Sequence, residues 1–160
     1  MEEKKDKMQL LKENYEKLQK KYGLPGFEEI NKDFEIEKLK SGSFMLKDIR
    51  RNMVEKIASV IKLFEMLMNP TSAPMFMFAV LKNMKNDTKK HIENLYKELT
   101  SVTISMVKLD ISFDEKSEAE AVKSIFKKWM SCKGQIVSIC NSMEDAWKES
   151  SKKSDKSYLG

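Results

Sequence analysis

The spacing of apolar residues constrains the fold of this chain more than any other feature. Apolar side chains recur at intervals of three and four residues along most of the sequence, and this spacing places them on one face of an α-helix. The first such run is Met8, Leu11, Tyr15, Leu18 and Tyr22. No stretch alternates apolar and polar residues over the length of a strand. The pattern therefore predicts an all-α protein.

Residues that stop or start helices divide this pattern into segments. Gly23 follows the first run, Pro70 ends the third, and Ser112 or Asp114 is suited to cap the last. We therefore expect four main helices plus one short acidic helix that begins near Phe27. The four main helices are predicted over residues 2–22, 44–69, 74–109 and 114–149, with Asn86-Asp87 as the one plausible break within 74–109.

The lengths of these segments suggest how the helices are arranged. Segments 74–109 and 114–149 are each 36 residues long and are joined by a short turn, so we expect a long coiled-coil-like hairpin. When segment 44–69 is paired with them across its turn, its apolar residues fall opposite their apolar residues. This agreement favours an antiparallel up-and-down helical bundle with 2–22 as the fourth member. We expect residues 1–149 to form a single helical-bundle domain. Residues 150–160 have nothing to bury, and we predict a flexible basic tail.

Composition excludes several classes of protein. Five glycines, three prolines and two cysteines in 160 residues do not fit a collagen, a loop-rich β-sandwich or a disulfide scaffold. The hydrophobic share of 41% is enough for a buried core. The first seven residues are charged, and no run approaches roughly 18 apolar residues. We therefore expect a cytoplasmic protein without a membrane span.

No motif in the sequence specifies a reaction. The single histidine, His91, is poorly placed for a di-iron or zinc site, because Cys132 and Cys140 lie on different faces of the last helix. We interpret His91, together with Lys133 and Thr88, as a polar layer that fixes helix register. Carboxylates occur in local runs interleaved with lysine, which is typical of solvated faces. We expect no enzyme activity, no metal and no cofactor.

The most unusual segment lies between residues 57 and 81. Only Lys62 and Glu65 are charged in these twenty-five residues, and apolar residues occupy every face of the predicted helices. A helix that is apolar all round is either buried or binds something, and methionine adapts to varied partners. We call its Met- and Phe-rich residues the Met/Phe tip: Met66, Met68, Met75, Phe76 and Phe78.

Two interpretations of the Met/Phe tip stay open. In the first, the N-terminal helix and the Trp147 end of the last helix cover the tip. In the second, the tip is a docking surface for a second copy of the chain, a partner helix or a membrane surface, in that order of preference. The second interpretation predicts a helical interaction or scaffold module that forms a homo-oligomer or binds a protein partner. A similar question concerns Ile111 and Phe113, which need the short acidic helix or a partner to cover them.

Basic residues support a different function. The net charge is +5, and it comes from 28 lysines and only two arginines. Lys47, Arg50 and Arg51 share one face of a predicted helix. The second basic face consists of Lys82, Lys85 and Lys89. The alternative function is therefore nucleic-acid binding. We expect it to be weak and non-specific, because lysine lacks the planar guanidinium group with which arginine makes two parallel hydrogen bonds to a phosphate or a base.

Overall fold

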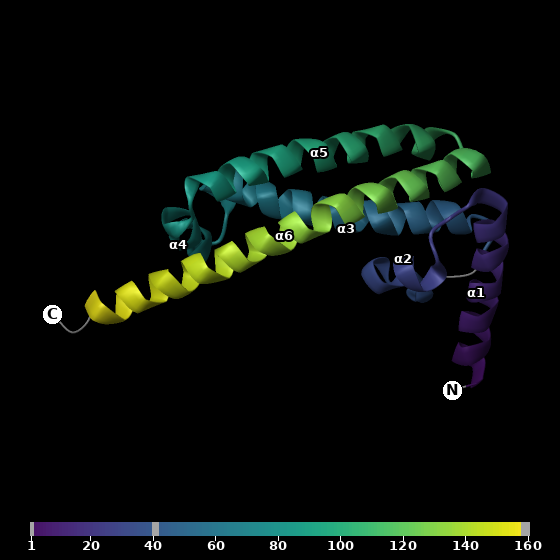
Figure 1. Cartoon of the computed structure of the whole chain (residues 1–160), viewed down its shortest axis with the longest axis horizontal. Helices are drawn as coiled ribbons and strands as arrows, with labels where there is room; N and C mark the ends of the chain where they lie inside the picture. The colour runs from purple at the N-terminus through teal and green to yellow at the C-terminus, as the bar shows by residue number, and fades with distance from the viewer. Residues whose placement is uncertain (1, 40–41, 158–160) are drawn as a thin grey trace. The chain divides into compact units, whose positions relative to one another are not determined.

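The fold is all-α, as predicted. The computed structural model describes residues 2–39 and 42–157, and these contain no strand. Six α-helices and two 3₁₀-helices follow one another along these residues (Figure 1). They are α1 (Glu2–Tyr22), α2 (Phe27–Phe34), η1 (Ile36–Lys38), α3 (Met45–Met68), η2 (Pro70–Ser72), α4 (Met75–Asn83), α5 (Asn86–Ile111) and α6 (Glu115–Ser157).

Two predicted helix ends carry the expected local geometry. Gly23 has a φ of 64°, and its N–H donates to the carbonyl of Gln19 at 2.8 Å, which closes the last turn of α1. Asp114 caps α6, because its carboxylate accepts from the backbone N–H of Ser117 at 2.8 Å. Glycine stops α1 and aspartate starts α6 for the reasons that the sequence suggests.

The predicted continuous helix over 74–109 is wrong, and so is the count of four main helices plus one short helix. Met84 has an extended backbone with a ψ of 135°, which separates α4 from α5. The Asn83 amide donates to the backbone carbonyls of Ala79 at 3.1 Å and Ala146 at 3.4 Å. A side chain that competes for backbone carbonyls in this way favours the end of a helix. The last helix is also longer than expected, because α6 continues to Ser157.

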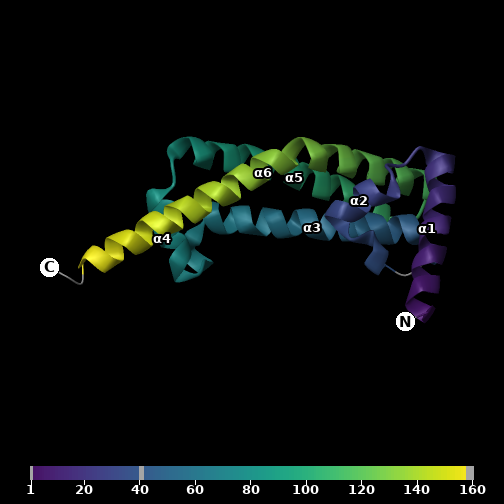
Figure 2. The same cartoon turned by 60° about the horizontal axis from the view of Figure 1, so that its bottom comes forward.

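The chain forms two compact units. The helices α3, α5 and α6 each contribute residues to both units. The first unit spans Met1–Ile57 and Val102–Trp129, and the second spans Ala58–Ser101 and Met130–Gly160. Figure 2 shows the same helices after a turn of 60°. The single domain over 1–149 and the flexible tail over 150–160 stay predictions.

In the first unit, aromatic side chains join α1 to the residues that follow it. Tyr15 is fully buried and its hydroxyl donates to the carbonyl of Pro25 at 2.8 Å. Its ring meets that of Phe27 edge-on, with centroids 5.5 Å apart. Burial, with a smaller effect of the Glu29 carboxylate, raises the pKa of Tyr15. This hydroxyl therefore stays protonated and keeps its hydrogen bond.

A second polar and aromatic cluster ties α2 to α3 and α6 within the first unit. The indole N–H of Trp129 donates to the Asp33 carboxylate at 3.0 Å, and the Phe34 ring lies 5.4 Å from the Trp129 ring. The Lys56 ammonium donates to the backbone carbonyl of Asp33 and lies 5.5 Å from the Trp129 ring. Because Asp33 is 7% exposed, these donors offset its removal from water.

A buried ion pair joins α3 to α6 in the first unit. Arg50 is 1% exposed and Glu118 is 0% exposed, with Arg50 Nε 2.5 Å from Glu118 Oε2. Arg50 Nη2 also donates to Asp110 of α5 at 2.9 Å, and Arg51 donates to the same carboxylate oxygen. Burial alone would lower the pKa of Arg50, but its hydrogen bonds to Glu118 and Asp110 raise it overall. Arg50 therefore stays charged in the core.

The second unit has its own core, built on the predicted periodicity. Along α6, buried residues recur at intervals of three and four, as they do along the first half of α5. The thiol of Cys132 lies 3.9 Å from the Glu98 carboxylate of α5. The buried apolar side chains of this unit are Phe64, Leu67, Met77, Val80, Met84, Ile92, Leu95, Leu99, Cys132, Ile136, Ile139 and Ala146.

Candidate functional site

The short helix α4 is the most exposed apolar element of the second unit. Its sequence, MFMFAVLKN, has Lys82 as its one charged residue. Met77 and Val80 face the core, at 3% and 2% exposure. Met75, Phe78 and Lys82 follow one another at intervals of three and four and are all exposed, so they share the opposite face. The helix is thus apolar toward the core and toward solvent.

The Met/Phe tip is largely open to solvent. Met75 is 86% exposed, Phe78 is 47% exposed and Phe76 is 46% exposed. Met68, at the end of α3, is 39% exposed, and Met66 is half-buried. These side chains are therefore not buried as the interpretation in which other helices cover the tip requires. Large apolar side chains that gather on a surface in this way are typical of binding sites.

An apolar groove lies between α4 and the C-terminal half of α6, which are neighbours in Figures 1 and 2. The rings of Phe76 and Trp147 meet edge-on, with centroids 6.0 Å apart, and form one wall. Trp147 is 46% exposed. The groove has a volume of about 350 Å³, and Glu144 is its one charged lining residue. It is lined by Leu63, Phe76, Val80, Cys140, Met143, Glu144 and Trp147.

A second groove lies between α3 and α5, and Leu81 of α4 also lines it. Its volume is about 360 Å³. It combines apolar side chains with two lysines, Lys89 and Lys97, and one carboxylate, Glu93. Val80 lines the first groove and Leu81 lines the second, so α4 contributes to both. The second groove is lined by Leu67, Met68, Leu81, Lys89, Ile92, Glu93, Tyr96 and Lys97.

Met66 lies at a third hollow, on the polar side of α3. This hollow has a volume of about 480 Å³ and includes Lys62, Glu65 and Tyr96. The Tyr96 hydroxyl donates to the Glu65 carboxylate at 3.2 Å. Met66 and Met68 therefore lie beside polar groups, whereas Met75, Phe76 and Phe78 make the exposed apolar surface of α4.

The residues of each predicted basic face differ in how far they are buried. Arg50 is buried against Glu118, and Arg51 shares the Asp110 carboxylate, so neither arginine of the first face is a free surface cation. Lys47 is half-buried. On the second face, Lys82 and Lys85 are exposed, and Lys89 is half-buried in the groove between α3 and α5.

The predicted polar core layer around His91 is wrong. His91 is exposed, while Lys133 and Thr88 are half-buried. The face of α5 that carries Ile92, Leu95 and Leu99 is the buried one. Within the described residues, no group of three histidines, cysteines or carboxylates is arranged to hold a metal ion.

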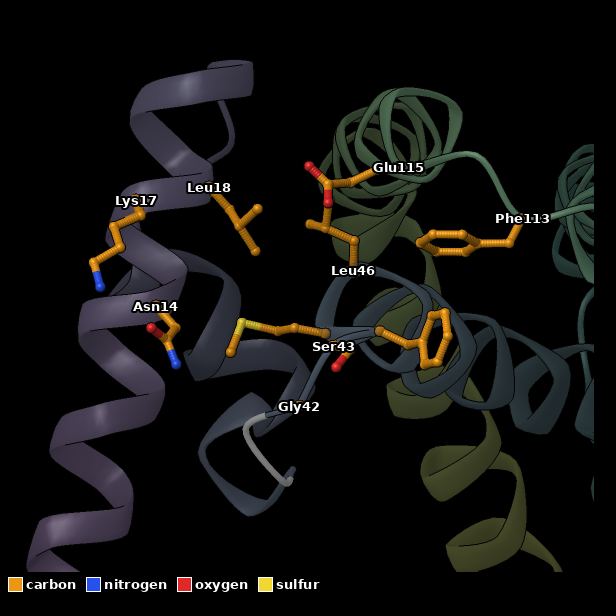
Figure 3. A pocket seen from close by; sticks show the side chains of 10 residues that line it. Asn14, Lys17, Leu18, Gly42, Ser43, Leu46, Phe113 and Glu115 are labelled. Atoms are coloured by element: carbon orange, nitrogen blue, oxygen red, sulfur yellow. The ribbon is translucent and has the colours of Figure 1, made fainter.

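The first unit contains a smaller pocket that the sequence did not indicate. Its volume is about 240 Å³. In Figure 3, Leu18 of α1 faces Leu46 and Glu115, whereas Lys17 extends away from them. Glu115 is already bound, because it accepts hydrogen bonds from Lys21 at 2.8 Å and from the Tyr22 hydroxyl at 2.5 Å. The carboxylate of Glu115 is therefore already paired within the chain.

One apolar face of α5 is also exposed in the first unit. Ile104, Val107 and Ile111 are 65%, 56% and 83% exposed, and their spacing places them on one side of the helix. Phe113 is 43% exposed and meets the ring of Phe44 edge-on at 5.0 Å. The short acidic helix α2 thus leaves Ile111 and Phe113 uncovered.

Two further findings bear on function. In the described part of the chain, no helix is long and apolar enough to span a membrane. Comparisons with family models, curated proteins and solved structures found no match to this chain. The surfaces of the molecule itself are therefore what indicates a function.

Proposed function

We propose that the chain is a non-enzymatic helical interaction module that docks an apolar helix of a protein partner on its Met/Phe tip. One observation carries this proposal. The helix α4 keeps Met77 and Val80 in the core while Met75, Phe76 and Phe78 remain 46 to 86% exposed. Keeping such side chains in water costs free energy, at roughly 25 cal/mol per Å² of apolar area. A partner that covers them recovers this free energy.

The shape of the surface supports a helix as the occupant. Each of the two grooves beside α4 has a volume of about 350 to 360 Å³, and helices recognise one another when the ridges of one enter the grooves of the other. The exposed ring of Trp147 and the methionines can adjust to the shape of the bound side chains.

The proposal includes the arrangement of the long helices. We infer an antiparallel up-and-down bundle in which α5 and α6 form a long coiled-coil-like hairpin. Its support is the short connection of residues 112–114 between them, since consecutive helices with short loops usually pack antiparallel. In such a bundle, α4 interrupts the helical path at one end and displays its apolar face there.

The experiment that tests this function compares two double variants of the full chain. Met75→Ser with Phe78→Ser removes the two most exposed large apolar side chains of α4, and neither faces the core. Ile104→Ser with Val107→Ser is the matched control, because these apolar side chains are also exposed but lie in the first unit. Sedimentation, thermal unfolding and binding of helical peptides from a display library are measured for each.

We expect the Met75/Phe78 variant to keep its helical circular dichroism and melting temperature and to lose peptide binding. If wild type sediments as more than one copy and the variant as one, the occupant is a second copy. A collapsed melting temperature with unchanged peptide binding would show that these side chains are merely core, and the proposal would fail.

The alternative function is weak nucleic-acid binding through Lys82, Lys85 and Lys89. The exposure of Lys82 and Lys85 favours it. It predicts affinity for single-stranded DNA that falls steeply with salt and that survives the Met75→Ser and Phe78→Ser changes.

A further inference from the structure

The charged residues nearest to α4 along the sequence are lysines, whereas Glu144 of α6 lines the groove beside Phe76. From Met66 to Asn86 the sequence contains no aspartate or glutamate, and its charged residues are Lys82 and Lys85. Asp87 is the first carboxylate after this stretch, and Lys89 and Lys90 follow it. The exposed apolar surface on α4 is therefore bordered on its C-terminal side by lysines.

The structure places these lysines at the edge of the apolar surface. Lys82 follows Phe78 by four residues on α4, so it lies one turn further along the same exposed face. Lys89 lines the groove between α3 and α5 together with Leu81. This groove also contains Glu93 and Lys97, which leaves one more cation than anion among its lining residues.

We propose that the partner segment is an amphipathic helix with an acidic flank. Its apolar side chains would cover Met75 and Phe78, and its aspartates or glutamates would face Lys82, Lys85 and Lys89. This inference rests on the proposed function and adds the charge of the partner to it. Charges at the rim of an interface select partners of opposite sign and speed their association, although each exposed ion pair contributes little affinity.

A peptide partner fits these observations better than a nucleic acid or an anionic membrane. Nucleic-acid surfaces combine cations with exposed aromatic rings on which bases stack, whereas Phe76 and Trp147 pack against each other edge-to-face, with an interplanar angle of 82°, beside an apolar groove. A membrane surface needs protruding apolar residues but does not fill grooves, whereas α4 contributes to two of them. Both alternatives are outcomes of the test below.

The test is a charge reversal in the full-length chain. Wild type is used to select peptides from a display library of random 16-residue helices, and the Lys82→Glu/Lys85→Glu/Lys89→Glu variant is used in parallel. The matched control, Lys108→Glu/Lys116→Glu/Lys127→Glu, changes three exposed lysines of the first unit. Circular dichroism and thermal unfolding establish that each variant is folded.

We expect wild type and the control to enrich peptides with apolar residues at helical spacing and aspartate or glutamate beside them. Reversal of the three charges should weaken the best acidic peptide by at least about tenfold at low salt, at roughly 0.5 kcal/mol or more for each exposed pair. The reversed variant should instead enrich peptides flanked by lysine or arginine, and both preferences should shrink as salt is raised.

Other results separate the two levels of the proposal. Enriched apolar peptides without a charge preference, or with one that survives the reversal, would overturn the acidic-flank inference and leave the docking function intact. Peptides that bind equally to the Met75→Ser/Phe78→Ser variant would overturn the docking function itself. Binding of phosphatidylserine vesicles or of oligo-dT that depends on the three lysines, without any enriched peptide, would overturn both in favour of a membrane or a nucleic acid.

Discussion

Replacement of Arg50 by methionine should destabilise the first unit severely. The change removes the guanidinium and leaves the carboxylate of Glu118, which is 0% exposed, without its cation. Loss of one partner from a buried ion pair costs about 3–5 kcal/mol, because the remaining charge is desolvated and uncompensated. At about 2–4 °C per kcal/mol, the melting temperature should fall by about 6–20 °C.

The geometry predicts an asymmetry between the two partners. Glu118→Leu should cost less than Arg50→Met, because Arg50 still donates to Asp110 at 2.9 Å and that carboxylate is partly exposed to water. Arg51→Met is the matched control. Its side chain is 51% exposed and binds the same carboxylate, so its loss should cost under about 1 kcal/mol.

The measurement is urea unfolding followed by far-ultraviolet circular dichroism for wild type, the three single variants and Arg50→Met/Glu118→Leu. The double variant should be more stable than Arg50→Met alone, since it removes the uncompensated charge. If Arg50→Met costs less than about 1 kcal/mol, or if the two single effects simply add, then Arg50 and Glu118 are not the buried, coupled pair that this reasoning requires.

Three more predictions concern the first unit. Tyr22→Phe removes a 2.5 Å hydrogen bond to Glu115 and should cost about 1 kcal/mol; amide hydrogen exchange should quicken in α1, and unchanged exchange would contradict it. Gly23→Ala should cost about 1–2 kcal/mol in urea unfolding, because φ is 64° there; an unchanged midpoint would show that the turn adapts. Hydrogen bonds from Arg50 hold the pKa of Asp110 below its ordinary 3.8, so its contribution is present above that pH and is lost as pH falls through the lowered pKa; a carboxyl titrating in NMR at its ordinary pKa would refute this.

Helix type and most helix ends could be predicted because they depend on near neighbours in sequence. Gly23 ends α1 and Asp114 caps α6 through bonds that span three or four residues. The sequence offers Asn86-Asp87 as a plausible break but does not place it at Met84, because part of the cause of that break is remote. Asn83 donates to Ala146, sixty-three residues away in sequence, and a single sequence does not reveal such a partner.

The candidate site, too, could be predicted from the sequence only in part. The apolar composition around α4 is visible in the sequence, but its exposure is not, since burial depends on which helices cover it. Arg50 shows the converse. It lies next to Arg51 in a basic run, and periodicity alone grouped it with surface cations. Its partner Glu118 comes from α6, so only the fold reveals that Arg50 belongs to the core.

The methionines of α4 provide a chemical record of whether this helix is covered. Met75 is 86% exposed and Met77, two residues later, is 3% exposed. Thioethers react with peroxide according to their access to solvent and gain one oxygen. One tryptic peptide, Leu63–Lys82, therefore contains both a reactive sulfur and a shielded reference. Mass spectrometry of the untreated and peroxide-treated protein then shows whether the exposed face of α4 is covered in the natural chain, without any substitution.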